Sequence, residues 1–323
     1  MKDSFGREIN YLRISITDRC NLRCRYCMPE GIQQVQMHEI LSYEEILEIA
    51  KAAASLGITK IKVTGGEPLV RLGCADLVKR LKEIPGIEQV TMTTNGILLK
   101  QNLPALKEAG IDAINVSLDT LKPEVFRMIT GSDRLQEVKA GIEASVSGGI
   151  RTKVNTVLQT GVNDGEWKDL VRLSKDLPID VRFIEMMPIG YGKKYPPVSN
   201  EDLKKQIEAE FGPIEEDHRV HGNGPAEYVR LSGFAGSIGF IGAIHGKFCS
   251  SCNRIRLTSM GKLKPCLCYG DTVDLRSILR DQNDHQEGLK QAIAEAITEK
   301  PQAHCFEQLN RITEEQEMIE IGG

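Results

Sequence analysis

Strand-like and helix-like segments alternate from Tyr11 to about Met187, and this alternation limits the folds that the chain can adopt. Amphipathic stretches lie between the strand-like runs. One of them, SYEEILEIAKAAASLG, has Ser42 as a suitable N-cap and Gly57 as a suitable end. The predicted strands are residues 11–17, 60–64, 89–94, 112–118, 152–157 and 180–186. Such strand–helix units predict an α/β fold with a parallel sheet and right-handed crossovers, as either a flat sheet or an incomplete barrel.

One face of each of the first five predicted strands is polar, and this favours the barrel. Side chains alternate between the two faces of a strand. The polar ones are Arg13, Ser15, Thr17, Lys62, Thr64, Thr91, Thr93, Asn95, Asn115, Ser117, Asp119, Lys153 and Asn155. Each would cost about 1–3 kcal/mol if left unpaired in a dry core. We therefore predict an incomplete (β/α)6 TIM-type barrel with a wide, wet lumen, and the cations indicate an anionic ligand. The alternative is a half-exposed sheet, although helices are expected to cover its outer side.

The alternation ends after the segment MMPIGYGKKYPP. A helix at about 199–211 and a Gly- and charge-rich stretch at 212–226 follow, and then short strands and two terminal helices. We therefore predict a barrel over residues 1–212 and a smaller C-terminal region over 213–323, which covers the barrel mouth.

Seven of the nine cysteines lie within residues 20–27 and 249–268. In a reducing compartment such clustered thiols indicate metal ligands rather than disulfides. The first group is Cys20, Cys24 and Cys27, spaced C-x3-C-x2-C. Three thiolates can hold three irons of a 4Fe–4S cluster and leave the fourth iron open for a small molecule. The alternative is a zinc or iron site that only braces the fold.

The second group is Cys249, Cys252 and Cys266. Arg254 and Arg256 lie two residues apart on a probable strand, so that both point the same way. Two guanidinium groups on one side, next to a cluster, favour an anionic substrate over plain surface exposure. Cys268 is an alternative fourth ligand, but its side chain would point opposite that of Cys266 in an extended segment.

The first cysteine group, with Tyr26 before its last member, resembles the radical S-adenosylmethionine superfamily. The segment VTGGEP at residues 63–68, which ends the second predicted strand, agrees with this. The resemblance implies that the open iron of the first cluster binds S-adenosylmethionine. It also implies that the cofactor site includes Tyr26, Gly66, Ser117 and Met187.

The second cysteine group, together with LRISITDRCNLRC, TTNG, NVSLD, KVN, RFIEMMP and the terminal Gly-Gly, resembles the GTP 3′,8-cyclases of molybdenum cofactor biosynthesis. The resemblance implies two 4Fe–4S clusters, S-adenosylmethionine as cofactor and GTP as substrate. The substrate-binding positions it implies are Arg13, Lys62, Thr93, Lys153, Arg254 and Arg256. The catalytic candidates are Arg254, Arg256, Gly322 and Gly323, although a Gly-Gly end is usually only a frayed terminus. Lys62 stands where the family often has arginine. A radical enzyme that modifies a peptide is the alternative function.

The chain has a net charge of −4, no apolar leader and no run of 18 apolar residues, so we expect a cytoplasmic enzyme that binds neither membrane nor nucleic acid. The resemblance implies a homodimer and a flavodoxin- or ferredoxin-like electron donor. His218 and His221 lie in a polar stretch and are predicted to face solvent. Cys74 and Cys305 are predicted to act as small hydrophobic residues, and Trp167 to pack a helix.

Overall fold

A single sheet of twelve strands organises the computed structural model, which describes residues 1–31, 35–281 and 285–322. Its order is β12-β11-β10-β1-β2-β3-β4-β5-β6-β9-β8-β7. The central strands are β1 (Tyr11–Ser15), β2 (Lys60–Thr64), β3 (Gln89–Thr94), β4 (Ala113–Ser117), β5 (Arg151–Val157) and β6 (Asp180–Ile184). These six strands are parallel to one another. The six predicted strands are therefore confirmed, with small differences at their ends.

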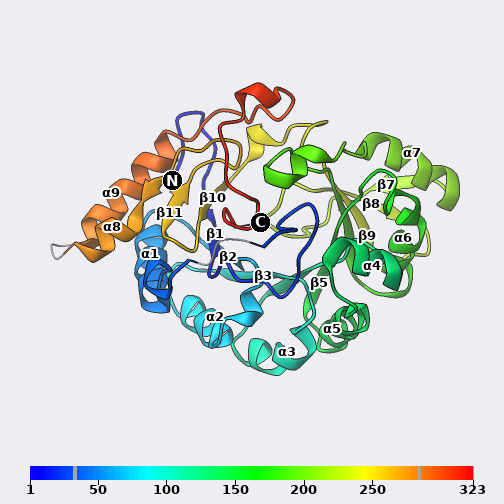
Figure 1. The fold of residues 1–323 in the computed structure, drawn as a ribbon, viewed down its shortest axis with the longest axis horizontal. Helices are drawn as coiled ribbons and strands as arrows, with labels where there is room; N and C mark the ends of the chain where they lie inside the picture. Colours follow the sequence, from blue (N-terminus) through cyan, green and yellow to red (C-terminus); the bar gives the residue numbers. More distant parts are fainter. Residues whose placement is uncertain (32–34, 282–284, 323) are drawn as a thin grey trace.

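The barrel is incomplete because β1 and β6 do not pair with each other. Instead β1 pairs with β10 (Arg254–Leu257), and β6 pairs with β9 (Ser237–Ile241). The outer side of the central strands is covered by α1 (Tyr43–Ser55), α2 (Cys74–Lys82), α3 (Leu99–Glu108), α4 (Pro123–Thr130), α5 (Leu135–Ser147) and α6 (Trp167–Asp176) (Figure 1). This arrangement excludes the half-exposed sheet.

Helix α1 begins and ends at the residues that the sequence predicts. Ser42 accepts a hydrogen bond from the backbone N–H of Glu45, and the Glu45 carboxylate accepts one from the backbone N–H of Ser42. This reciprocal capping satisfies two backbone donors at the start of the helix. Gly57 follows the helix with a φ of 93°, which glycine adopts without steric cost.

The C-terminal part of the chain extends both edges of the same sheet. After α7 (Asn200–Phe211), β7 (Ile214–Glu216), β8 (Glu227–Leu231) and β9 continue it beyond β6. Beyond β1 lie β10, β11 (Lys262–Lys264) and β12 (Val273–Asp274), followed by α8 (Leu275–Arg280) and α9 (His285–Thr298). The predicted boundary at residue 212 thus falls within one continuous sheet and stays a prediction.

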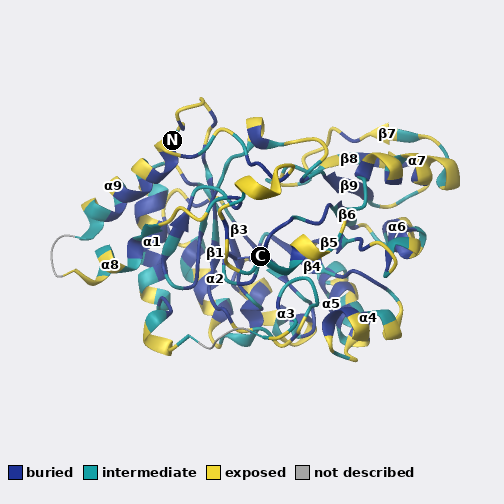
Figure 2. Cartoon of the chain, turned by 45° about the horizontal axis from the view of Figure 1, so that its top comes forward, coloured by how far each residue is buried: buried dark blue, intermediate teal, exposed yellow. Residues whose placement is uncertain are grey.

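Apolar side chains of the central strands point outward and pack under the helices. Ile14, Ile61, Val63, Val116 and Val154 are buried and belong to the main hydrophobic core. Figure 2 shows this core as a dark layer between the strands and the exposed outer sides of the helices. The polar faces of the strands are consequently left to face the lumen. Trp167 packs against Phe211 of α7, with their ring centroids 6.2 Å apart, as predicted.

The last residues of the chain return across the barrel, and the C-terminus lies near its centre (Figure 1). A second, smaller core holds this segment and includes Leu267, Cys268, Cys305, Phe306 and Ile321. Among the described helices, none is long and apolar enough to cross a bilayer.

A buried ion pair also ties the returning segment to the sheet. The Lys264 ammonium on β11 contacts the Glu314 carboxylate, and the two side chains are 0% and 2% exposed. We expect Glu314→Ala to lower the free energy of unfolding by about 3–5 kcal/mol, because it leaves the ammonium buried without its carboxylate. Urea denaturation of the wild type and the variant measures the difference.

The matched control is Glu215→Ala, which removes the solvent-exposed pair of Glu215 and Arg230. Its cost should be under about 1 kcal/mol. If the two variants lost the same stability, the buried pair would not be what fastens this segment.

Candidate active site

The inward faces of the central strands surround a large cavity. Its lining includes Arg13, Lys62, Thr64, Thr91, Thr93, Asn95, Asn115, Ser117, Asp119, Lys153 and Asn155. The predicted wet lumen is therefore confirmed for these side chains. Ser15 and Thr17, two members of the predicted polar face, bond locally instead. The Ser15 hydroxyl donates to the Thr17 carbonyl, and the Thr17 hydroxyl accepts from the backbone N–H of Arg19.

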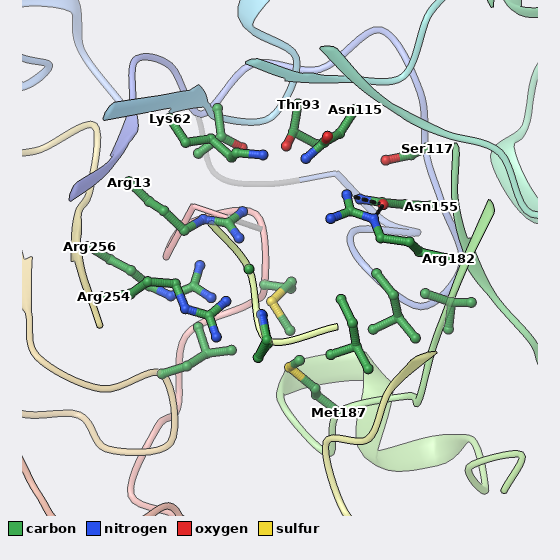
Figure 3. Close-up of a pocket in the computed structure, with 18 of the residues that line it drawn as sticks. Arg13, Lys62, Thr93, Asn115, Ser117, Asn155, Arg182, Met187, Arg254 and Arg256 are labelled. Carbon is green, nitrogen blue, oxygen red and sulfur yellow. Dashed lines mark hydrogen bonds between the residues drawn. The ribbon is translucent and has the colours of Figure 1, made fainter. Parts of the chain in front are cut away.

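The strand register places cations side by side in this cavity. Arg13 is paired with Arg256 on one side and with Lys62 on the other. Neighbouring strands are about 4.8 Å apart, so the bases of these side chains are close. Figure 3 shows Arg13, Arg254 and Arg256 on one side of the cavity and Arg182 on the other, with their charged ends directed inward.

The pKa shifts record the mutual repulsion of these cations. Burial, followed by the charges of Arg182 and Arg13, lowers the pKa of Lys62 well below its usual value. Burial lowers the pKa of Arg13 to about 10, and Arg254 and Arg182 act in the same direction, whereas Tyr11 opposes them. Burial and then Arg13 and Arg254 lower the pKa of Arg256. A cavity in which like charges depress one another's ionisation is suited to a multiply charged anion.

Lys62 is the clearest case of an uncompensated charge. It is 7% exposed and has neither a hydrogen bond nor an ion pair within the described part of the chain. Burying an ammonium group without a partner is unfavourable. An anionic ligand would supply the missing partner.

Lys153, by contrast, already uses its three N–H donors. The ammonium donates to the His221 carbonyl, to the Tyr228 hydroxyl at 3.0 Å and lies 3.0 Å from an Asp180 carboxylate oxygen. Burial, followed by the charge of Arg182, lowers the pKa of Lys153 to about 8, although Asp180 opposes this shift. To contact a substrate, Lys153 would have to exchange one of these partners.

His221 is buried, so the prediction that it faces solvent is wrong. Its side chain is 8% exposed, with Nδ1 2.9 Å from Asp180 and Nε2 3.0 Å from Asp217. Its ring stacks on Tyr228 at a centroid distance of 3.9 Å. His218 is exposed, as predicted.

Arg182 lines the cavity, although it was not among the site residues predicted from the sequence. It lies on β6, lines the cavity and donates to the Asn155 side-chain oxygen from Nε at 2.9 Å. The signal was available, because Asp180, Arg182 and Ile184 continue the period of two on the sixth strand and the polar face ends at Arg182.

The first cysteine group follows β1, and Cys20, Cys24 and Cys27 all line the cavity. Burial and then the proximity of Cys27 raise the pKa of Cys24, and burial followed by Cys20 raises that of Cys27 to about 12. Three thiols that repel one another as thiolates fit a site that supplies positive metal charge. The spacing of the thiols along the chain, C-x3-C-x2-C, suits a 4Fe–4S cluster, in which each thiolate binds a different iron.

The Gly-Gly-Glu-Pro turn fixes the segment that leads into these cysteines. Backbone N–H groups of Gly66 and Glu67 donate to the carbonyls of Thr17 and Arg19, both at 2.8 Å. A Cβ at Gly66 would lie 2.4 Å from the Arg19 carbonyl oxygen, so only glycine fits there. The buried Glu67 carboxylate accepts from Leu69, Thr94 and Asn95, and burial raises its pKa to about 7.

The predicted cofactor residues share the cavity with the first cysteine group. Tyr26, Gly66, Ser117 and Met187 all line the cavity. The Tyr26 hydroxyl donates to an Asp119 carboxylate oxygen at 2.8 Å. This bond fixes the ring of Tyr26 beside the thiols. The close packing of Gly66 explains the glycine without a ligand, so its role in cofactor binding stays a prediction.

The second cysteine group lies around β10, the strand that pairs with β1, and lines the same cavity. Cys249, Cys252 and Cys266 line it together with Arg254 and Arg256. Burial raises the pKa of Cys252, but Lys300 and Arg254 outweigh burial and leave that pKa lowered. This thiol is therefore the more readily available as a thiolate ligand.

Cys268 is directed away from the cavity, as its alternation with Cys266 predicts. It is fully buried in the smaller core, with its sulfur 3.3 Å from that of Cys305. Cys305 and Cys74 are buried too, in agreement with their predicted role as small hydrophobic residues. Three thiols of the second group thus line the cavity, and Cys268 is not among the described residues that do so.

The end of the chain reaches the cations. The Gly322 carbonyl accepts hydrogen bonds from Arg13 at 3.3 Å and from Arg256 at 3.2 Å. Gly323 lies outside the described residues. The catalytic roles predicted for these two glycines remain predictions.

Comparison with known proteins agrees with this geometry. The Radical SAM superfamily model matches residues 14–174, and the Molybdenum Cofactor Synthesis C model matches residues 179–306. The GTP 3′,8-cyclase of Clostridium perfringens (strain 13 / Type A) is 43% identical over 324 residues, which cover 100% of both chains. That of Heliobacterium modesticaldum is 47% identical over 312 residues, which cover 94% of both chains.

A solved structure supports the fold. The structure of Streptococcus suis SuiB bound to S-adenosylmethionine has a TM-score of 0.64 at 15% identity, over 88% of this chain and 68% of that chain. The family of this chain is assigned from the full-length sequence matches and not from its structural similarity to SuiB. The chain belongs to the GTP 3′,8-cyclase family of the radical S-adenosylmethionine superfamily.

Proposed function

We propose that this protein converts GTP to (8S)-3′,8-cyclo-7,8-dihydroguanosine 5′-triphosphate, the first step of molybdenum cofactor biosynthesis. The observation that carries the proposal is a cavity that several buried cations share with two groups of three thiols. A nucleoside triphosphate has several negative charges, which suit the buried cations. It also has a neutral base, which suits a position beside a group of thiols. The names of the full-length relatives support the same substrate.

Cys20, Cys24 and Cys27 would hold a 4Fe–4S cluster, beside which Tyr26, Gly66, Ser117 and Met187 would bind S-adenosylmethionine. When bound, these groups would supply the radical chemistry that removes the hydrogen from C3′ of GTP and allows C3′ to bond to C8. The protein itself contributes by holding the cofactor site in a fixed position. The Gly-Gly-Glu-Pro turn and the bond from Tyr26 to Asp119 keep the cofactor site fixed relative to β1.

The substrate would be held at both ends. Cys249, Cys252 and Cys266 would hold a second 4Fe–4S cluster with an open position that faces the guanine. The triphosphate and ribose would contact Arg13, Lys62, Thr93, Lys153, Arg182, Arg254 and Arg256. Fixing the base and the phosphates leaves the ribose little freedom, which brings C3′ to the radical source at small entropic cost.

Arg254, Arg256, Gly322 and Gly323 remain the proposed catalytic residues. Arg256 and Arg13 hold the Gly322 carbonyl inside the cavity, so the tail would cover bound substrate and exclude water. We also propose a flavodoxin- or ferredoxin-like electron donor and a homodimer. Both of these partners rest on the family resemblance alone.

Modification of a peptide is the weaker alternative. SuiB has also been solved with its precursor peptide SuiA, at a TM-score of 0.60 and 17% identity, which supports only a shared fold. A peptide gives no reason for several buried cations that repel one another. A metal site that only braces the fold gives no reason for thiols that line a cavity.

The direct test is anaerobic incubation of the cluster-loaded protein with GTP, S-adenosylmethionine and a reductant. We expect 5′-deoxyadenosine and the cyclised nucleotide in equal amounts. Formation of 5′-deoxyadenosine without any GTP-derived product, under conditions in which GTP is bound, would contradict the proposed reaction.

The two cysteine groups should have separable roles. Cys24→Ala should abolish cleavage of S-adenosylmethionine, because the first cluster loses a ligand. Cys252→Ala should retain some cleavage but lose GTP turnover, because only the second cluster is damaged. The wild type should contain about eight irons per chain and each variant about four. Normal GTP cyclisation by Cys252→Ala would show that the second group has no role in the reaction.

Binding of GTP should depend on pH because the pKa of Lys153 is lowered to about 8. Below this pH the ammonium is already protonated, whereas above it a bound triphosphate raises the pKa and draws a proton from solvent. We therefore expect proton uptake on binding at pH 8.5 and an affinity that falls as pH rises above 8. Calorimetry in buffers of different ionisation enthalpy measures the uptake. Equal binding heats in all buffers at pH 8.5 would argue against contact between the cations and the substrate.

A further inference from the structure

The Gly-rich segment at residues 221–225, His-Gly-Asn-Gly-Pro, forms a floor to the cavity. It lies between β7 and β8, and all five residues line the cavity. The Asn223 side chain donates to Gln89, the first residue of β3, at 2.6 Å, and the His221 carbonyl accepts from Lys153 near the start of β5. The segment therefore crosses the end of the lumen opposite the first cysteine group, which follows the C-terminal end of β1.

Several contacts fix His221, the first residue of this floor. His221 lies between the carboxylates of Asp180 and Asp217, and it stacks on Tyr228. The Asp217 carboxylate also accepts from the Ser237 hydroxyl at 2.7 Å. With Asn223 fixed to Gln89, the backbone between these points has a defined position.

The backbone of the floor has unused donors. The N–H groups of Gly222, Asn223 and Gly224 have no hydrogen-bond partner among the residues that the structure describes. Successive backbone N–H groups can form a concavity that binds anions where they converge in a turn. The same arrangement in glycine-rich loops cradles phosphate groups.

The two glycines leave room beside two cations. A Cβ at Gly222 would lie 3.4 Å from the Lys153 ammonium nitrogen, and one at Gly224 would lie 3.9 Å from the Arg182 guanidinium. A side chain at either position would thus touch a cation, and glycine lets the backbone N–H groups lie close to both charges instead. Buried Lys62, which lines the same cavity, lacks a partner among the described residues and needs an anion nearby.

The position of the floor indicates which phosphate it meets. The second cysteine group lies beside β10 and β1, whereas the floor contacts β3, β5 and β6 on the other side of the barrel. A nucleotide with its base at the second group and its ribose below the first directs its phosphates toward the floor. We infer that the backbone N–H groups of Gly222, Asn223 and Gly224 bind the terminal phosphate of the nucleoside triphosphate, and so select it over the di- and monophosphate. This inference rests on the proposed function.

Gly224→Ala tests the inference. Gly224 does not have a left-handed φ, and the nearest atom to a new Cβ is at an ordinary contact distance of 3.9 Å, so the variant should fold. The methyl group would occupy the space meant for the phosphate. We expect the Kd for GTP to rise about tenfold or more and those for GDP and GMP to change by less than about threefold. Calorimetry on the anaerobic, cluster-loaded protein measures all three constants.

Gly165→Ala is the matched control, because Gly165 is exposed, has no atom within 4 Å of a new Cβ and does not line the cavity. It should leave all three constants unchanged. Gln89→Ala, which releases Asn223 but keeps every backbone N–H, should weaken GTP binding in the same selective way and less strongly.

The outcomes separate this inference from the proposed function. If the wild type binds GTP tightly and Gly224→Ala binds it equally well, or loses GTP, GDP and GMP to the same extent, the floor does not recognise the terminal phosphate. If the wild type itself fails to bind GTP, both the proposed function and this inference are overturned.

Discussion

The repulsion among buried cations in one lumen is the constraint on which the structure of the site depends. Burial first, and then the charges of neighbouring cations, lower the pKa values of Arg13, Lys62 and Arg256. Like charges at such distances in a medium of low dielectric constant raise the free energy of the empty protein. The protein bears this cost because the cavity is built for a polyanion, and the resting fold is thereby less stable than its large core would allow.

The fold assembles this site from both edges of a single sheet. The central strands carry the polar face, β10 and the segments around it bring the second cysteine group to the β1 edge, and the segment before β8 brings the floor to the β6 edge. The tail then covers the cations from above through Gly322. Residues distant in the sequence therefore meet in one cavity because the barrel is left open between β1 and β6.

Much of this arrangement was predictable, because period-two patterns and cysteine spacing are local signals. Lys62 and Asn115 face the lumen as their alternation requires, and Cys268 points away from it as its spacing from Cys266 requires. What was not predictable depends on long-range contacts. His221 lies in a polar segment that looks solvent-exposed, yet its side chain is buried because Asp180 on β6 and Tyr228 on β8 close around it, in addition to the local partner Asp217. Arg182, by contrast, was missed although the local signal was present, because Asp180 and Arg182 continue the polar face on the sixth strand.

The thermal unfolding midpoint of the protein with and without inorganic tripolyphosphate tests the central claim most directly. An anion that binds only the folded state stabilises it in proportion to its affinity. We expect tripolyphosphate to raise the unfolding midpoint and the rise to become smaller at high salt. Guanosine at the same concentration should have a much smaller effect on the midpoint. A midpoint that tripolyphosphate leaves unchanged at low salt would show that the cations of the lumen do not need an anion, and would contradict the account.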